Sequence, residues 1–272
     1  MRVWNFIEGK MYINNILCKQ LALDYCCSEE DVKDNQHHFT EFSFLEGRRR
    51  FREEKDCFLK VTIVNGKILA SGNISIIEWF EKEFGNARGE WFFEPETLRR
   101  IDHKLQEAGY KIGMLHPFYI ADTISEVAPK EYEIRWYEEK DIEQFRGDER
   151  FIEAYSFCTE APDVLGVGAY KDGEILGMAG ASADSPIMWQ IGINVMPEAE
   201  GLGIAKSLVK LLKNEIIKRG VVPFYGTAIS HLASQSVALG SGFHPAWIEL
   251  AATKESSSSE RVEGNNDGAY VL

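Results

Sequence analysis

The stretch IGINVMPEAEGLGIAKSLVK, residues 191–210, combines the end of a strand, a glycine loop and the start of a helix. The apolar run before Pro197 is typical of a buried strand, which proline ends because it has no backbone N–H for the ladder. After the loop, apolar residues recur at helical spacing until Gly220. Such a glycine loop can bind a phosphate or only turn the chain, so both interpretations are open.

Two common phosphate-binding patterns do not fit this loop. A P-loop ends in Gly-Lys-Ser or Gly-Lys-Thr, and Ala205-Lys206-Ser207 matches only its last two positions. A dinucleotide-binding loop needs a third glycine at the position that Lys206 holds. The sequence therefore excludes the nucleotide sites that these two loops build.

Regular elements flank this stretch on both sides. Asn65-Gly66 and Asp172-Gly173 each lie between two apolar runs and predict tight β-hairpins. The similarity of NGKILA and DGEILG around these turns indicates either a duplicated half-domain or two hairpins that converged. Helices are expected at 74–84, 94–109, 204–219 and 230–240, and further strands at 131–137, 188–196, 221–229 and 243–252.

The predicted fold is α/β in the sense of α+β, with a mixed, mostly antiparallel central sheet flanked by helices. We expect an N-terminal α/β domain over residues 1–130, a more regular domain over 131–254 and a disordered tail over 255–272. The tail is polar and of low complexity, which does not allow a packed core.

Charge and composition exclude several function classes. The formal net charge of -13 argues against nucleic acid as a partner, and it suits a cationic substrate as well as solubility alone. The 5 cysteines include no Cys-x-x-Cys pair, so neither a disulfide framework nor a zinc site is predicted. His37-His38 has no ligand spacing around it and predicts no metal site. We expect no membrane partner, because the sequence shows no signal peptide and no long apolar run. We expect a cytoplasmic location.

The order of elements over residues 131–252 resembles that of the Gcn5-related N-acetyltransferases. That family carries [QR]-x-x-G-x-[GA] between a strand and the next helix, and here Gly203 and Ala205 fill the last two positions. Its strand ends in an apolar-x-Val-x-Pro run, as IGINVMP does, and its last short helix is followed by Gly-Phe, as at Gly242-Phe243. For the N-terminal domain, a divergent half of the same fold and an unrelated α/β domain with a convergent hairpin both stay open.

The resemblance implies acetyl-CoA as the cosubstrate. The pantetheine arm is expected in a gap between two strands, paired with strand backbone, and the pyrophosphate on the N–H groups of the loop. Side chains of the two following helices are expected to add contacts. The implied cofactor-binding residues are Ile193, Asn194, Val195, Gly201, Leu202, Gly203, Ile204, Ala205, Lys206, Ser207, His231 and Ser234.

Acetyl transfer to an amine needs a proton acceptor for the ammonium and stabilisation of the carbonyl oxygen and the departing thiolate. Tyr225, on the strand beside the gap, is a candidate acid or substrate contact, with core packing as the alternative. Glu160 is a candidate base, although a base acting through water is an equal alternative. Asp184, Trp189 and Gln190 are candidates for binding the acceptor, and each has a turn or core role as its alternative.

Three positions depart from the family pattern. Glu200 replaces a Gln or Arg, and its carboxylate is expected to face away from the phosphates because like charges repel. His231 replaces an Asn, and Ala238 replaces a Tyr that many relatives use to protonate the thiolate.

The sequence thus predicts an enzyme that moves an acetyl group from acetyl-CoA to an amine of a small molecule by direct attack in a ternary complex. A non-catalytic acyl-CoA sensor and an interaction module with a merely structural loop are the alternatives. We expect the N-terminal domain to shape the acceptor pocket or a homodimer interface.

Overall fold

The computed structural model describes residues 15–49, 57–128 and 131–255. Contacts divide these residues into two compact units, the first made of 15–46, 57–115 and 246–255 and the second of the remainder. The division differs from the expected boundary after residue 130, because the last strand belongs largely to the first unit. The predicted tail lies outside the described residues beyond Glu255.

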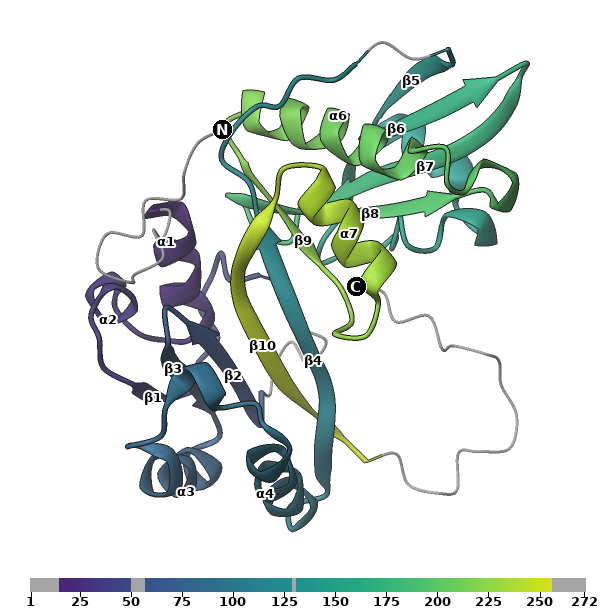
Figure 1. Cartoon of the computed structure of the whole chain (residues 1–272). Helices are drawn as coiled ribbons and strands as arrows, with labels where there is room; N and C mark the ends of the chain where they lie inside the picture. The colour runs from purple at the N-terminus through teal and green to yellow at the C-terminus, as the bar shows by residue number, and fades with distance from the viewer. Residues whose placement is uncertain (1–14, 50–56, 129–130, 256–272) are drawn as a thin grey trace. The chain divides into compact units, whose positions relative to one another are not determined.

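The first unit is a sheet with helices packed on it (Figure 1). Its strands run in the order β1-β3-β2-β10-β4. Its elements are α1 (Asn15–Asp24), α2 (Glu29–Lys33), β1 (His38–Glu41), β2 (Leu59–Val64), β3 (Lys67–Gly72), α3 (Ile74–Phe84), η1 (Gly89–Trp91), α4 (Pro95–Gln106), the first half of β4 (Tyr110–Ile120) and most of β10 (His244–Lys254).

Local signals account for the hairpin and helices of this unit. Asn65 and Gly66 both have positive φ, 53° and 74°, which is the conformation of a tight hairpin turn between β2 and β3. The Asn73 side chain caps α3 by accepting from the Ser75 N–H at 3.0 Å. The apolar faces of α3 and α4 then cover β2, β3 and β10, and this packing forms the core of the unit.

The second unit has a mostly antiparallel sheet in the order β4-β9-β8-β7-β6-β5, in which only β8 and β9 run parallel. Its elements are the end of β4, β5 (Glu133–Glu138), α5 (Glu139–Ile142), η2 (Glu143–Phe145), η3 (Glu149–Phe151), β6 (Asp163–Lys171), β7 (Glu174–Ser182), β8 (Met188–Val195), η4 (Pro197–Ala199), α6 (Ile204–Lys218), β9 (Val222–Gly226) and α7 (Leu232–Gly240).

Helix α6 lies across β6, β7 and β8 on one face of this sheet (Figure 1). Ile204, Leu208, Leu212 and Ile216 point into the core, which explains their spacing in the sequence. The opposite face is covered by the short helical segments between β5 and β6, around Phe151 and Tyr155. Helix α5 is short: it stops at Ile142, and 3-10 turns follow.

The structure confirms the mixed α+β fold with a large, mostly antiparallel sheet and flanking helices. Both predicted hairpins are present, and Asp172 and Gly173 also have positive φ. Among the described residues, no helix has the length and hydrophobicity needed to cross a membrane.

Candidate functional site

A cavity of about 890 Å³ opens in the second unit beside the start of α6. This volume lies in the range of small-molecule and cofactor sites. The predicted residues that line it are Ile193, Val195, Gly201, Gly203, Ile204, Ala205, Lys206, Tyr225, His231 and Ser234. The cavity therefore brings together the glycine loop, the strand before it and the three polar residues predicted further along the chain, Tyr225, His231 and Ser234.

The cavity exists because β8 and β9 separate. They pair in parallel from Met188↔Val222 to Gln190↔Phe224, and beyond that point no pairing joins them. Ile191, Gly192, Ile193 and Val195 of β8 and Tyr225 of β9 line the space. Strand edges that part in this way leave backbone N–H and C=O groups facing a ligand.

The glycine loop and the start of α6 form one end of the cavity. Gly201 and Gly203 have φ of 75° and 77°, and a Cβ built on either would meet no atom within 4 Å. The first N–H groups of any helix lack intrahelical acceptors. Gly203, the N-cap of α6, has no side chain that could accept from them. The Ser207 hydroxyl in the next turn is buried and has no hydrogen-bond partner among the described residues. The first N–H groups of α6 suit an anion such as a pyrophosphate, whereas Ser207 does not line the cavity.

Tyr225 is buried, and its hydroxyl lies 2.9 Å from Ser234 Oγ. Burial raises the pKa of Tyr225 to about 12; Ser234 opposes the rise and the negative charge of Glu153 adds to it. The phenol is therefore protonated at neutral pH and can donate a hydrogen bond into the cavity.

Glu153 also lines the cavity, and the sequence analysis did not identify it. It follows the 3-10 turn η3, is half-buried, and has its pKa raised by burial, with His231 as a nearby charge acting in the opposite direction. His116 lines the same space. No local motif marks Glu153, because its position depends on where its segment crosses the sheet.

Three glycines and an asparagine of the sheet contact the segment that carries Glu153. Gly166, Gly180 and Gly192 are register partners across β6, β7 and β8. A Cβ on Gly192 would lie 1.7 Å from the Glu153 carbonyl oxygen, and one on Gly180 would lie 2.0 Å from that of Ala154. Backbone can approach the sheet this closely only where side chains are missing.

Asn194, on the same face of β8 as Gly192, holds the crossing segment. Its Oδ1 accepts from the Glu153 N–H at 3.0 Å and from the Ala154 N–H at 2.8 Å. Asn194 was predicted as a cofactor residue through its backbone; its side chain does not line the cavity.

The remaining predicted residues lie away from the cavity lining. Leu202 is 66% exposed, and Ser207 lies one helical turn behind the loop. Glu160 is exposed and accepts from Cys158 Sγ at 3.0 Å. The Asp184 carboxylate accepts from Ser182 Oγ at 2.6 Å.

Trp189 packs against the core of the second unit and Gln190 is buried. The described structure thus does not bring Glu160, Asp184, Trp189 or Gln190 to this cavity.

The three departures from the family pattern are visible at the site. Glu200, whose carboxylate we expected to face away, is exposed and contributes to the lining. His231 is also exposed and lines the cavity, while Ala238 is fully buried in the core.

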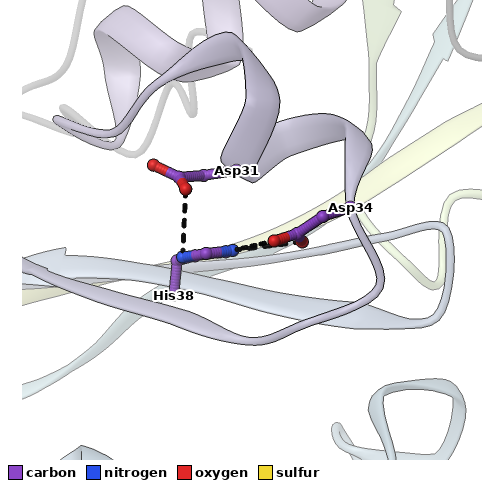
Figure 2. A group of neighbouring side chains, drawn as sticks. All are labelled: Asp31, Asp34 and His38. Atoms are coloured by element: carbon purple, nitrogen blue, oxygen red, sulfur yellow. Dashed lines mark hydrogen bonds and ion pairs between the residues drawn. The ribbon is translucent and has the colours of Figure 1, made fainter.

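Asp31, Asp34 and His38 in the first unit form the one group, within the described ranges, whose geometry could hold a metal ion (Figure 2). His38 lies between the carboxylates, with Nε2 2.9 Å from Asp34 Oδ2 and Nδ1 3.6 Å from Asp31 Oδ1. Asp34 Oδ1 is already 3.1 Å from the buried Lys67 Nζ. The carboxylates thus have cationic and imidazole partners within the protein, and the group is an ion-pair network.

Comparison with known proteins points to one family. Residues 122–243 match the model of the acetyltransferase (GNAT) family. No curated protein matches the chain.

Solved structures of the same family are similar at low identity. A GCN5-related N-acetyltransferase-like protein from Streptococcus suis is 14% identical, with 78% of this chain and 89% of that chain covered and a TM-score of 0.45. A GCN5-related N-acetyltransferase from Kribbella flavida is 13% identical, with 59% and 64% covered and a TM-score of 0.42.

Proposed function

We propose, from the premise that residues 122–243 are an acetyltransferase domain of the GNAT family, that the protein moves an acetyl group from acetyl-CoA to the amine of a small molecule. The observation that carries the proposal is the separation of β8 from β9 over a cavity that ends at the uncapped start of α6. Acetyl-CoA supplies the acetyl group as a thioester, and it would bind along this gap.

The residues of the loop fit the diphosphate of the cosubstrate. Gly203 leaves open space where a side chain would stand, and the first-turn N–H groups of α6 point at it. Ser207 has an unpaired hydroxyl one turn further on. The backbone of Ile193 and Val195, on the β8 side of the gap, would pair with the amide groups of the pantetheine arm.

Glu153 would accept the proton of the amine, and Tyr225 would stabilise the leaving group by a hydrogen bond. The Glu153 carboxylate, with a pKa raised by burial, accepts one proton of the incoming ammonium and leaves a neutral amine. The amine nitrogen then bonds to the acetyl carbon, the carbon–sulfur bond breaks, and the second nitrogen proton leaves with the sulfur. Tyr225 has too high a pKa to give up its proton, so it stabilises the departing sulfur by donating a hydrogen bond.

The test begins with acetyl-CoA binding. Acetyl-CoA should raise the melting temperature more than acetate does, and thiol should be released with at least one of putrescine, spermidine, glucosamine, tryptamine or a tripeptide with a free amino group. A melting temperature that does not respond to acetyl-CoA would contradict the proposal. Tight binding without thiol release for any amine would favour the second candidate, an acyl-CoA sensor, which the missing Tyr at Ala238 supports.

The placement of the diphosphate is tested by Gly203→Leu, which puts a side chain into the open end of the cavity. Gly220→Leu is the matched control, because Gly220 also has positive φ and open space but lies after the C-terminal end of α6. Both variants carry a similar backbone cost of about 1–2 kcal/mol. Only Gly203→Leu should lose acetyl-CoA binding; equal loss in both variants would mean that the diphosphate lies elsewhere.

A further inference from the structure

Glu153 lies in a segment between η3 and β6 that lacks regular secondary structure, yet it must present a carboxylate at a fixed place. The three residues Glu153, Ala154 and Tyr155 cross the sheet face over the glycine row Gly166, Gly180 and Gly192. The bare backbone of these strands lets the segment lie against the sheet, but a glycine surface offers no side chain that holds it in place.

The side chain of Asn194 supplies that hold. Its oxygen accepts from two successive N–H groups, those of Glu153 and Ala154, at 3.0 and 2.8 Å. Because both partners are donors, the atom that faces them is the amide oxygen, and its orientation is not ambiguous. The contact fixes the backbone on the N-terminal side of the Glu153 Cα and the peptide unit after it.

The position of Asn194 links this contact to the reaction site. Strand residues alternate between faces, so Asn194 and Gly192 face the crossing segment while Ile191, Ile193 and Val195 face α6. Ile193 and Val195, the neighbours of Asn194, line the cavity. One strand therefore carries the cosubstrate side of the site on one face and the support of Glu153 on the other.

Electrostatic effects place Glu153 near Tyr225 and His231. Its negative charge raises the pKa of Tyr225, and His231 acts on the pKa of Glu153, so the three groups lie within electrostatic reach of one another. All three line the same cavity. A displaced backbone at Glu153 would move the carboxylate away from the place where the amine must lose its proton.

We infer that Asn194 is a positioning residue for acetyl transfer: through two hydrogen bonds to the Glu153–Ala154 backbone it sets the place of the Glu153 carboxylate in the cavity. This inference rests on the proposed function. It assigns to Asn194 a role in the proton-transfer step, in addition to the backbone pairing with the cosubstrate that the sequence predicts.

The test compares three substitutions by the dependence of kcat on pH, measured by thiol release with the most active amine of the panel above. Glu153→Gln should remove the acidic limb of the profile, which is the fall in kcat at low pH as the base becomes protonated. Asn194→Ala should lower kcat by about 10- to 100-fold, since small misplacements of a reacting group have effects of this size. It should also shift the acidic limb to lower pH, because a released Glu153 reaches water and its pKa falls toward its ordinary value.

Asn194→Asp tests the hydrogen bonds themselves. A carboxylate can accept from the same two N–H groups, so most of kcat should return. The added negative charge should move the acidic limb in the opposite direction, to higher pH. The KM for acetyl-CoA should change less than 3-fold in both variants, because the Asn194 side chain does not line the cavity.

Asn214→Ala is the matched control. Asn214 also binds backbone with its side chain, accepting from the Ser125 N–H at 2.9 Å and donating to the Ser125 carbonyl at 2.7 Å, and it does not line the cavity. It should lose stability without a shift in the acidic limb. An active wild-type protein with the same limb in Asn194→Ala and Asn214→Ala would overturn the inference alone. A wild-type protein that binds acetyl-CoA but acetylates no amine would overturn the proposed function and this inference with it.

Discussion

At the scale of single residues, the chemistry of the site depends on side chains whose pKa values are shifted by their surroundings. Tyr225 is a phenol that burial keeps protonated, and its hydroxyl lies within hydrogen-bond distance of Ser234. Glu153 is a carboxyl group that burial makes a better base. Glu200 adds a carboxylate to the cavity lining beside the glycine loop.

Tyr225→Phe should lower kcat by about 10- to 100-fold while acetyl-CoA binding stays nearly unchanged, because the lost hydrogen bond matters most when charge develops on the sulfur. Steady-state kinetics and acetyl-CoA titration measure the two effects. Tyr119→Phe is the control: Tyr119 is the register partner of Tyr225 on β4 and is also buried, but it does not line the cavity. Equal losses in both variants would assign Tyr225 to packing only.

Glu200→Gln should strengthen acetyl-CoA binding by about 5-fold, since a like charge at contact distance in water costs about 1 kcal/mol. Salt should weaken this difference, because it screens exposed charges. Calorimetric titration at low and high salt measures both effects. Glu198→Gln, an exposed glutamate of η4 outside the lining, should show no gain. Unchanged affinity in Glu200→Gln would mean that its carboxylate does face away from the phosphates.

At the scale of elements, the sequence predicted the features that depend on interactions between neighbouring residues. The hairpin turns at Asn65-Gly66 and Asp172-Gly173, the apolar stripe of α6 and the glycine loop before it all follow from a few neighbouring residues. The split between β8 and β9 came only from the family resemblance. Glu153 was missed because its place depends on glycines in three separate strands, and no spacing along the chain records which strands become neighbours.

Gly192→Ala should lower the free energy of unfolding by about 3 kcal/mol, because the new methyl group meets a backbone carbonyl that cannot rotate away. Urea unfolding measures the change, and acetyl transfer should fall with it as Glu153 is displaced. Gly168→Ala, also within the sheet, should cost about 1 kcal/mol or less, since its nearest neighbours are the side chains of Tyr170 and Met178. Similar costs for both would show that the crossing segment moves freely.

At the scale of the whole molecule, buried lysines link stability to pH, and Lys213 is one of them. Lys213 on α6 is fully buried and donates to the Thr123 carbonyl at 3.1 Å and to Ser125 Oγ at 2.5 Å. Burial is the main reason why the pKa of Lys213 is lowered from 10.5 to about 8. Between these two pH values the unfolded chain binds more protons than the folded protein, so stability rises with pH.

The free energy of unfolding should therefore rise by about 2 kcal/mol from pH 7.5 to 9.5 in the wild-type protein relative to Lys213→Met. The comparison with the variant is needed because buried thiols act in the opposite direction: burial raises the pKa of Cys27 to about 12, which costs stability as the unfolded thiol ionises. Denaturant unfolding at several pH values measures the difference. Parallel curves for the two proteins would contradict this account.

Strand β10 is the element whose partners the sequence predicted least. It was expected in the C-terminal domain, but in the first unit it lies between β2 and β4, and Ile248–Ala251 pair with Lys60–Ile63. The sequence of a strand does not indicate which distant strand it pairs with, since strand propensity depends on the surroundings. The expectation that the N-terminal domain is a divergent half of the same fold stays a prediction.

The place of β10 also sets an order of events on the ribosome. β2 and β4 are made early, yet the strand that lies between them is synthesised only after residue 243. At ordinary translation rates the nascent chain carries these two unpaired strand edges for about 10 s, which exposes them to pairing with other chains. The unit that is translated first is thus completed last, so chaperones that cover strand edges should matter most for this part of the protein.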